Sequence, residues 1–148
     1  MGKSSFIRSA TFVSLLVASV AAAHEHATGV VKERMDAMKS MDRSVKDIKE
    51  LFNRKTDLAK VKDEALNIQN HAAKITALFP AGSTQAPTDA KASLWKNWTD
   101  FASKAQALET ESTKLAQADP ANRDALRAQF KAMNQTCTGC HKLYRADR

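Results

Sequence analysis

The chain has 148 residues, a formal net charge of +7 at pH 7 and 43% hydrophobic residues. This length fits a single domain. Positive and negative charges are mixed along the chain without a basic run, which indicates a solvated surface and argues against a nucleic-acid-binding protein. The positive balance remains compatible with electrostatic steering toward an acidic partner.

The first 23 residues have the pattern of a secretory signal peptide. Lys3 and Arg8 form a short positive start, and residues 10–20 are a mostly apolar run. Alanines at 21, 22 and 23 provide the small residues that signal peptidases require. We therefore expect cleavage near Ala23, a mature domain of residues 24–148 and a periplasmic location. The alternative is a short membrane anchor; no later stretch is apolar enough to span a bilayer, so the mature domain should have peripheral or no membrane contact.

Four segments repeat apolar residues at alternating spacings of three and four, and they predict helices over residues 28–52, 57–78, 89–118 and 120–146. This period is typical of left-handed helix packing at shallow angles, whereas strands would need a period of two. The pattern predicts an all-α protein, an antiparallel four-helix bundle with up-down-up-down connections. In the first segment the stripe comprises Val31, Met38, Met41, Val45, Ile48 and Phe52, with Arg34 in the remaining slot.

The connections agree with these four helices. Residues 53–56 form a short polar turn, and residues 79–88 contain proline and glycine and predict a longer crossing loop. Asp119 followed by Pro120 predicts the N-cap and first position of the last helix. In the third helix we expect Trp98 in the core and Trp95 partly buried.

Cys137-Thr138-Gly139-Cys140-His141 is a C-x-x-C-H motif, and it contains the only two cysteines of the chain. Two thiols at this spacing can add to the vinyl groups of a haem, and the adjacent histidine can ligate the iron. On a helix, positions i, i+3 and i+4 share one face. A disulfide or a redox C-x-x-C centre are the alternatives, but the latter occurs near a βαβ pattern, which is absent from this sequence. The motif predicts one covalent haem c with its iron, and His141 as an axial ligand.

In an up-down-up-down bundle, the start of the first helix lies beside the end of the last helix. Met38 is therefore a candidate for the open side of the iron, where a thioether would complete six-coordination. The residues alone leave Met35, Met41 or simple core filling as alternatives, with Met35 turned off the stripe. Arg34 is unusual on an apolar stripe; it could pair with a haem propionate, or pack its stem while its head reaches water.

Residues 31–39 and 137–145 resemble the cytochrome c′ family, and in particular its low-spin branch, the cytochromes c-556. The resemblance implies that Arg34 lies near a propionate and that the residue four positions later faces the distal side of the iron. That residue is commonly leucine in five-coordinate cytochromes c′ and methionine in six-coordinate c-556 proteins, so the resemblance favours Met38. Arg145 matches a basic residue that the family often has near the proximal histidine; the alternative is a surface arginine.

Together these features predict an exported monohaem cytochrome that carries single electrons, with His141 and Met38 as the iron ligands. No residue pattern suggests an enzyme. The expected partners are redox proteins, and the resemblance adds a homodimer. The alternative is a high-spin cytochrome c′ whose open sixth site binds a diatomic gas, NO or CO. A second alternative is a haem-free helical bundle that acts as an interaction module.

Overall fold

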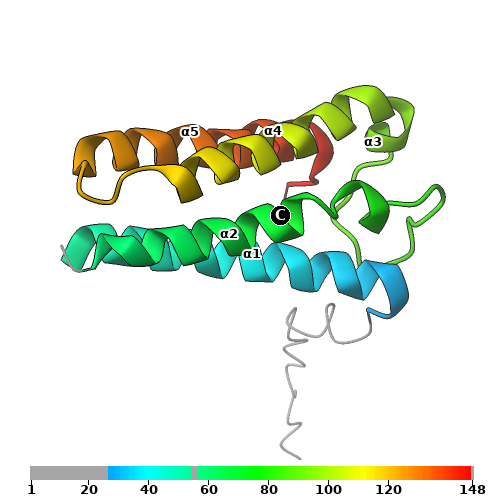
Figure 1. The fold of residues 1–148 in the computed structure, drawn as a ribbon. Helices are drawn as coiled ribbons and strands as arrows, with labels where there is room; N and C mark the ends of the chain where they lie inside the picture. Colours follow the sequence, from blue (N-terminus) through cyan, green and yellow to red (C-terminus); the bar gives the residue numbers. More distant parts are fainter. Residues whose placement is uncertain (1–26, 55–56, 148) are drawn as a thin grey trace, which may run out of the picture.

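The computed structural model describes residues 27–54 and 57–147, so the predicted signal peptide lies outside the described residues. Four long helices form the molecule: α1 (Gly29–Arg54), α2 (Val61–Ala72), α4 (Trp98–Gln117) and α5 (Arg123–Tyr144). Shorter helical segments are η2 (Leu58–Lys60), η3 (Thr76–Leu78) and α3 (Ser93–Lys96). The predicted antiparallel four-helix bundle is confirmed, with α1 and α2 forming one layer and α4 and α5 the other (Figure 1).

The apolar stripes of the four helices meet in one core. Its most buried side chains, each with at most 1% exposure, include Ile48, Val61, Ile68, Leu94, Leu115, Leu126 and Met133. Backbone contacts join α2 to α4, α4 to α5 and α1 to α2, whereas α1 and α5 approach each other much less. These two helices do meet where α1 ends, because the rings of Phe52 and Phe130 lie 5.8 Å apart.

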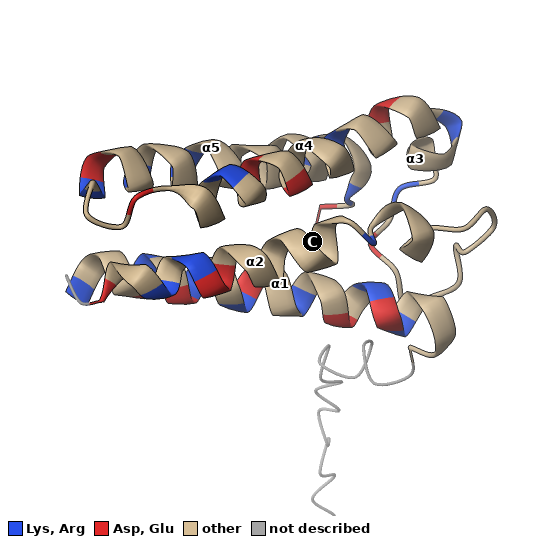
Figure 2. Cartoon of the chain, in the orientation of Figure 1, with Lys and Arg blue, Asp and Glu red and all other residues tan. Residues whose placement is uncertain are grey.

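Charged residues of both signs occur along all four long helices (Figure 2). Several form pairs one turn apart, such as Lys46 with Asp42 at 2.6 Å and Arg54 with Glu50 at 2.5 Å. Exposed pairs of this kind contribute little to stability. None of the helices in the described ranges is long and apolar enough to cross a membrane.

The third predicted helix is interrupted. The short helix α3 ends before Asn97, whose φ of −117° and ψ of 44° are not helical, and α4 begins at Trp98. Leu94 is buried at 1%, but Trp98 is 39% exposed, so its predicted core position is wrong. The periodicity does not continue across the break, and the core face resumes only at Phe101. Trp95 is partly buried, as expected.

The last helix begins three residues later than predicted. Asn122 is its N-cap, and its side chain accepts a hydrogen bond from the backbone N–H of Ala125 at 3.1 Å. The Asp119 carboxylate instead accepts from the N–H of Ala121 at 2.9 Å, within the preceding turn. The assignment of Asp119 as the N-cap was therefore wrong, because a turn containing Pro120 separates it from the helix.

Candidate haem site

The C-x-x-C-H residues lie in the last part of α5, which is continuous from Arg123 to Tyr144. Because the helix is unbroken here, Cys137, Cys140 and His141 share one face. All three line a cavity of about 390 Å³. The two cysteines are free rather than joined in a disulfide, and both are partly buried. The motif thus lies at a cavity.

The wall opposite α5 is supplied by α1, from Arg34 to Lys49. Met38 lines the same cavity as the C-x-x-C-H residues, and it is partly buried against the core. Met41 also lines it but is only 6% exposed. Met35, which the sequence pattern turned off the apolar stripe, is a third lining methionine. The structure therefore brings all three candidate thioethers to the site.

Burial sets the protonation of the groups on α5. It raises the pKa of the Cys137 thiol, and it raises the pKa of Cys140 to about 11. Both cysteines are therefore protonated thiols near neutral pH. Partial burial, together with the nearby charge of Arg145, lowers the pKa of His141. The imidazole is accordingly favoured in its neutral form, which is the form that ligates metals.

Arg34 lines the cavity and is only 3% exposed, so its head does not reach water. Its guanidinium donates to Ser83 Oγ at 3.0 Å, to the Ser83 carbonyl at 2.8 Å and to Thr88 Oγ1 at 2.7 Å. It also lies over the Phe79 ring, 4.8 Å from the centroid. Burial lowers the pKa of Arg34. No carboxylate among the described residues pairs with this buried cation.

Arg145 also lines the cavity, where its Nε lies 3.6 Å from a carboxylate oxygen of Asp89. Its side chain is 44% exposed. The backbone around it pairs with the loop before α3: the Lys91 N–H donates to the Tyr144 carbonyl at 2.9 Å, and the Ala146 N–H donates to the Asp89 carbonyl at 2.7 Å. Sequence reasoning missed this pairing, because no local pattern distinguishes it from an ordinary loop.

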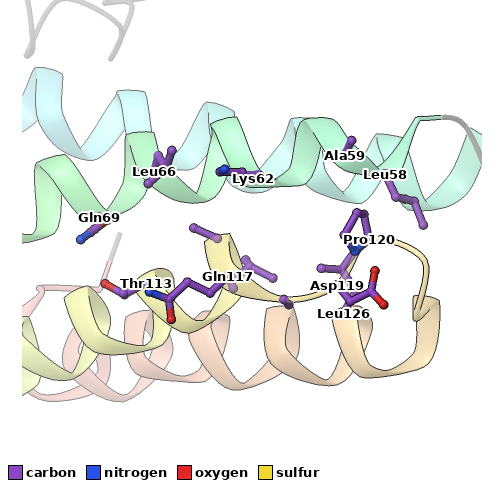
Figure 3. Close-up of a pocket in the computed structure, with 13 residues that line it drawn as sticks. Leu58, Ala59, Lys62, Leu66, Gln69, Thr113, Gln117, Asp119, Pro120 and Leu126 are labelled. Carbon is purple, nitrogen blue, oxygen red and sulfur yellow. The ribbon is translucent and has the colours of Figure 1, made fainter.

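A second and larger cavity, of about 610 Å³, lies between the start of α2 and the end of α4 (Figure 3). Its lining includes Leu58, Lys62, Thr113 and Pro120, and none of its described lining residues is a cysteine, histidine or methionine. Volume alone would favour this cavity. The C-x-x-C-H residues and the three candidate methionines line the smaller cavity, which is therefore the candidate site.

The sequence profile of one protein family, described as Cytochrome C', matches residues 29–145. The chain belongs to the cytochrome c′ family. It is 29% identical over 132 residues to a cytochrome c′ of Rhodospirillum rubrum, covering 88% of this chain and 86% of that protein. It is 32% identical over 89 residues to a cytochrome c-556 of Agrobacterium tumefaciens, covering 60% of this chain and 72% of that protein.

Solved structures of cytochromes c′ have the same fold. One is a nitric oxide complex of a variant of cytochrome c prime from Alcaligenes xylosoxidans, with a TM-score of 0.72 and 27% sequence identity. The similarity covers 80% of this chain and 94% of that chain. The predicted family and bundle are thus both confirmed.

Members of the cytochrome c′ family carry one covalently bound haem c with its iron, so this cofactor, predicted from the motif, is confirmed. The residues present fit such a group. Two free thiols and an imidazole share one helix face, and the same cavity is lined by a buried cation that pairs with no carboxylate of the described residues. The assignment of individual residues to the haem remains a proposal.

Proposed function

We propose that this cytochrome c′ family protein is an exported, periplasmic carrier of single electrons, not an enzyme. Cys137 and Cys140 hold the haem through thioether bonds, and His141 and Met38 are the two axial ligands of the iron. One observation carries the proposal: Met38 lines the cavity from α1, while the C-x-x-C-H residues line it from α5. The first part of α1 and the last part of α5 thus lie on either side of one cavity.

The bound haem supplies the one-electron couple, and the protein residues determine its environment. A histidine and a methionine together saturate the iron, which favours electron transfer and a raised reduction potential. The apolar walls, among them Ile68, Leu94 and Phe101, exclude water from the site. Arg34 and Arg145 supply positive charge at the cavity for the acidic groups of the cofactor.

Met38 is preferred to the other two methionines for reasons of position. Met41 is buried in the core and has less freedom to turn toward a ligand site. Position along the cavity does not separate Met35 from Met38, because both line it within one turn of α1. The spacing from Arg34 does: Met38 falls four residues after Arg34, which is the register that the resemblance to c-556 proteins implies.

The alternative is a high-spin cytochrome c′ whose sixth site is open to NO or CO. The relatives include proteins named cytochrome c′ as well as cytochrome c-556, and a structural neighbour was solved with nitric oxide. Both functions use the same attachment residues, so only the sixth iron position distinguishes them. In this alternative Met38 would be a wall residue of the gas site.

The visible spectrum of the purified ferric protein tests the proposal. Six-coordination by histidine and methionine predicts a low-spin spectrum with a far-red methionine–iron band. Met38→Leu should abolish that band and yield a high-spin spectrum that responds to NO and CO. Met35→Leu and Met41→Leu are matched controls and should retain the band. A high-spin spectrum of the unaltered protein, or loss of the band only with a control variant, would exclude Met38.

Redox partner proteins are the expected partners. Without Lys3 and Arg8 of the predicted signal peptide the formal net charge is +5, which favours partners with an acidic surface. Electron exchange with such a partner should slow as ionic strength rises, because salt screens the attraction. A rate independent of salt would argue against steering. Analytical ultracentrifugation with and without a gas ligand would test the homodimer that the family resemblance adds.

A further inference from the structure

The loop between α2 and α4 closes one side of the haem cavity, and its polar contacts converge on Arg34. We call residues 79–91 the strap. All three hydrogen bonds of the Arg34 guanidinium go to the strap, to Ser83 and Thr88, and the ring beneath it is Phe79 of the same segment. Arg34 therefore joins α1 to the strap at the edge of the cavity.

The acceptors on the strap are held in fixed positions. The Ser83 hydroxyl donates its single proton to the Pro80 carbonyl at 2.8 Å, so it can serve Arg34 only as an acceptor. Thr88 Oγ1 accepts a second hydrogen bond, from the Ala90 N–H at 3.1 Å. Trp95 Nε1 lies 3.1 Å from the Pro80 carbonyl and donates to it. Ser83 is only 6% exposed, so little water competes for its hydroxyl.

The other end of the strap is anchored to the chain just beyond His141. Ala90 and Arg145 form an isolated antiparallel bridge, and Asp89 and Lys91 on either side pair with the backbone of residues 144–146. The strap thus runs from the Arg34 side of the cavity to the carboxyl end of α5. Anchoring at both ends restricts the positions that its hydroxyl groups can take.

The strap accepts hydrogen bonds from only three of the N–H groups of the Arg34 guanidinium. A guanidinium has five N–H groups. Nη2 of Arg34 donates both of its hydrogens, to the Ser83 carbonyl and to Thr88, and Nη1 donates one, to Ser83 Oγ. The second N–H of Nη1 and that of Nε have no acceptor among the described residues. A cation that is 3% exposed and has no carboxylate partner is costly, so an anionic group in the adjoining cavity would stabilise it.

We propose that Ser83 and Thr88 are positioning residues, which hold the Arg34 guanidinium so that its two remaining donors face a carboxylate of the haem. This inference rests on the proposed role of Arg34 as a propionate contact and adds the residues that orient it. A positive charge fixed beside the cofactor favours the reduced state, which has one positive charge fewer, and so raises the reduction potential. Without the two hydroxyl groups the guanidinium can turn away, and the potential falls.

Midpoint potentials of the haem-loaded protein test this inference with three variants. Thr88→Val and Ser83→Ala each remove one acceptor of Arg34. Each also removes one hydrogen bond within the strap, to the Ala90 N–H and to the Pro80 carbonyl respectively, so stability is measured as well. Thr84→Val is the matched control, because Thr84 is an exposed residue of the same strap whose side chain is not bonded to Arg34. We expect the first two variants to lower the potential and the control to leave it unchanged.

An Arg34→Gln background shows whether the hydroxyl groups act through Arg34. On that background Thr88→Val should have no further effect on the potential, since the group it positions is gone. Melting temperatures are measured alongside. A loss of stability in Thr88→Val and Ser83→Ala with potentials equal to that of Thr84→Val would overturn the proposal. So would an equal drop in potential from Thr88→Val with and without Arg34.

The test of the strap can fail or succeed independently of the test of iron ligation by Met38. The far-red band reports Met38, whereas the difference in potential between Thr88→Val and Thr84→Val reports the strap. If the unaltered protein lacks the band, the ligation proposal fails and the comparison of potentials still decides the role of the strap. If Arg34→Gln itself leaves the potential unchanged, Arg34 is not a propionate contact and the inference falls with it.

Discussion

Replacing Phe101 by leucine should loosen the end of the bundle that holds the haem cavity. Phe101 is 3% exposed, and its ring lies 5.1 Å from that of Phe79, 5.5 Å from that of Trp98 and 5.6 Å from that of Tyr144. Its partners belong to the strap, α4 and α5, so one side chain joins three segments. Leucine retains most of the buried apolar volume but makes none of the ring contacts.

The expected loss of folding stability follows from these ring contacts. Aromatic pairs at such separations contribute about 0.5–1.5 kcal/mol beyond the area they bury. The pairs with Phe79 and Tyr144, at 68° and 89°, have the favourable edge-on geometry, and the third is tilted at 40°. Because the three pairs share one ring, we take less than their full sum and expect Phe101→Leu to lower the free energy of unfolding by about 1–3 kcal/mol.

Guanidinium unfolding of the haem-loaded protein, followed by circular dichroism, measures this loss. Phe130→Leu is the control: Phe130 is partly buried and has one ring partner among the described residues, so about 0.5–1 kcal/mol should be lost. A double-mutant cycle with Phe79→Leu isolates one ring pair from the difference in burial. A loss for Phe101→Leu no larger than that of Phe130→Leu, or a coupling energy near zero in the cycle, would refute the reasoning.

Two further predictions concern the ends of α5. Asn122→Ala should lower the free energy of unfolding by about 1 kcal/mol, because the N-cap hydrogen bond to α5 is lost. In the same denaturation assay Asp119→Ala should lower it by less. An equal or larger loss for Asp119→Ala would indicate that Asp119 is the N-cap. The hydrogen bond from Tyr144 to Asp100 raises the pKa of Tyr144 from 10.0 to about 12. A raised pKa contributes stability that is complete below pH 10 and is lost as pH rises to about 12. Melting curves across this range should therefore show a steeper alkaline loss for the unaltered protein than for Tyr144→Phe, and parallel losses would contradict the assignment.

Local periodicity was sufficient to predict the architecture. The spacing of apolar residues gave four helices and their antiparallel order, because a helix must bury its apolar stripe whatever its neighbours are. The C-x-x-C-H motif predicted a covalent haem, since its three reacting groups are brought onto one face by the helix geometry alone. Helix periodicity also identified Arg34, because a cation is unusual in a stripe of apolar residues that faces the core.

Breaks and caps were less predictable. Asp119 with Pro120 has the composition of a helix start, yet Asn122 is the N-cap, because several adjacent residues can cap and the turn selects among them. Trp98 continues the apolar spacing of its segment, but the helix restarts there after Asn97. Periodicity reports orientation only within an unbroken helix.

The sequence by itself thus determined the bundle, the family and the attachment motif, since each depends on residues close together in the chain. Tertiary structure alone decided what surrounds Cys137-Thr138-Gly139-Cys140-His141. It placed Met35, Met38 and Met41 around one cavity, and it fixed Arg34 to a strap whose far end pairs with the backbone beyond His141. Contacts between residues about 50 positions apart depend on how loops cross the bundle. No local pattern encodes that crossing, because its hydrogen bonds form only after the helices have packed.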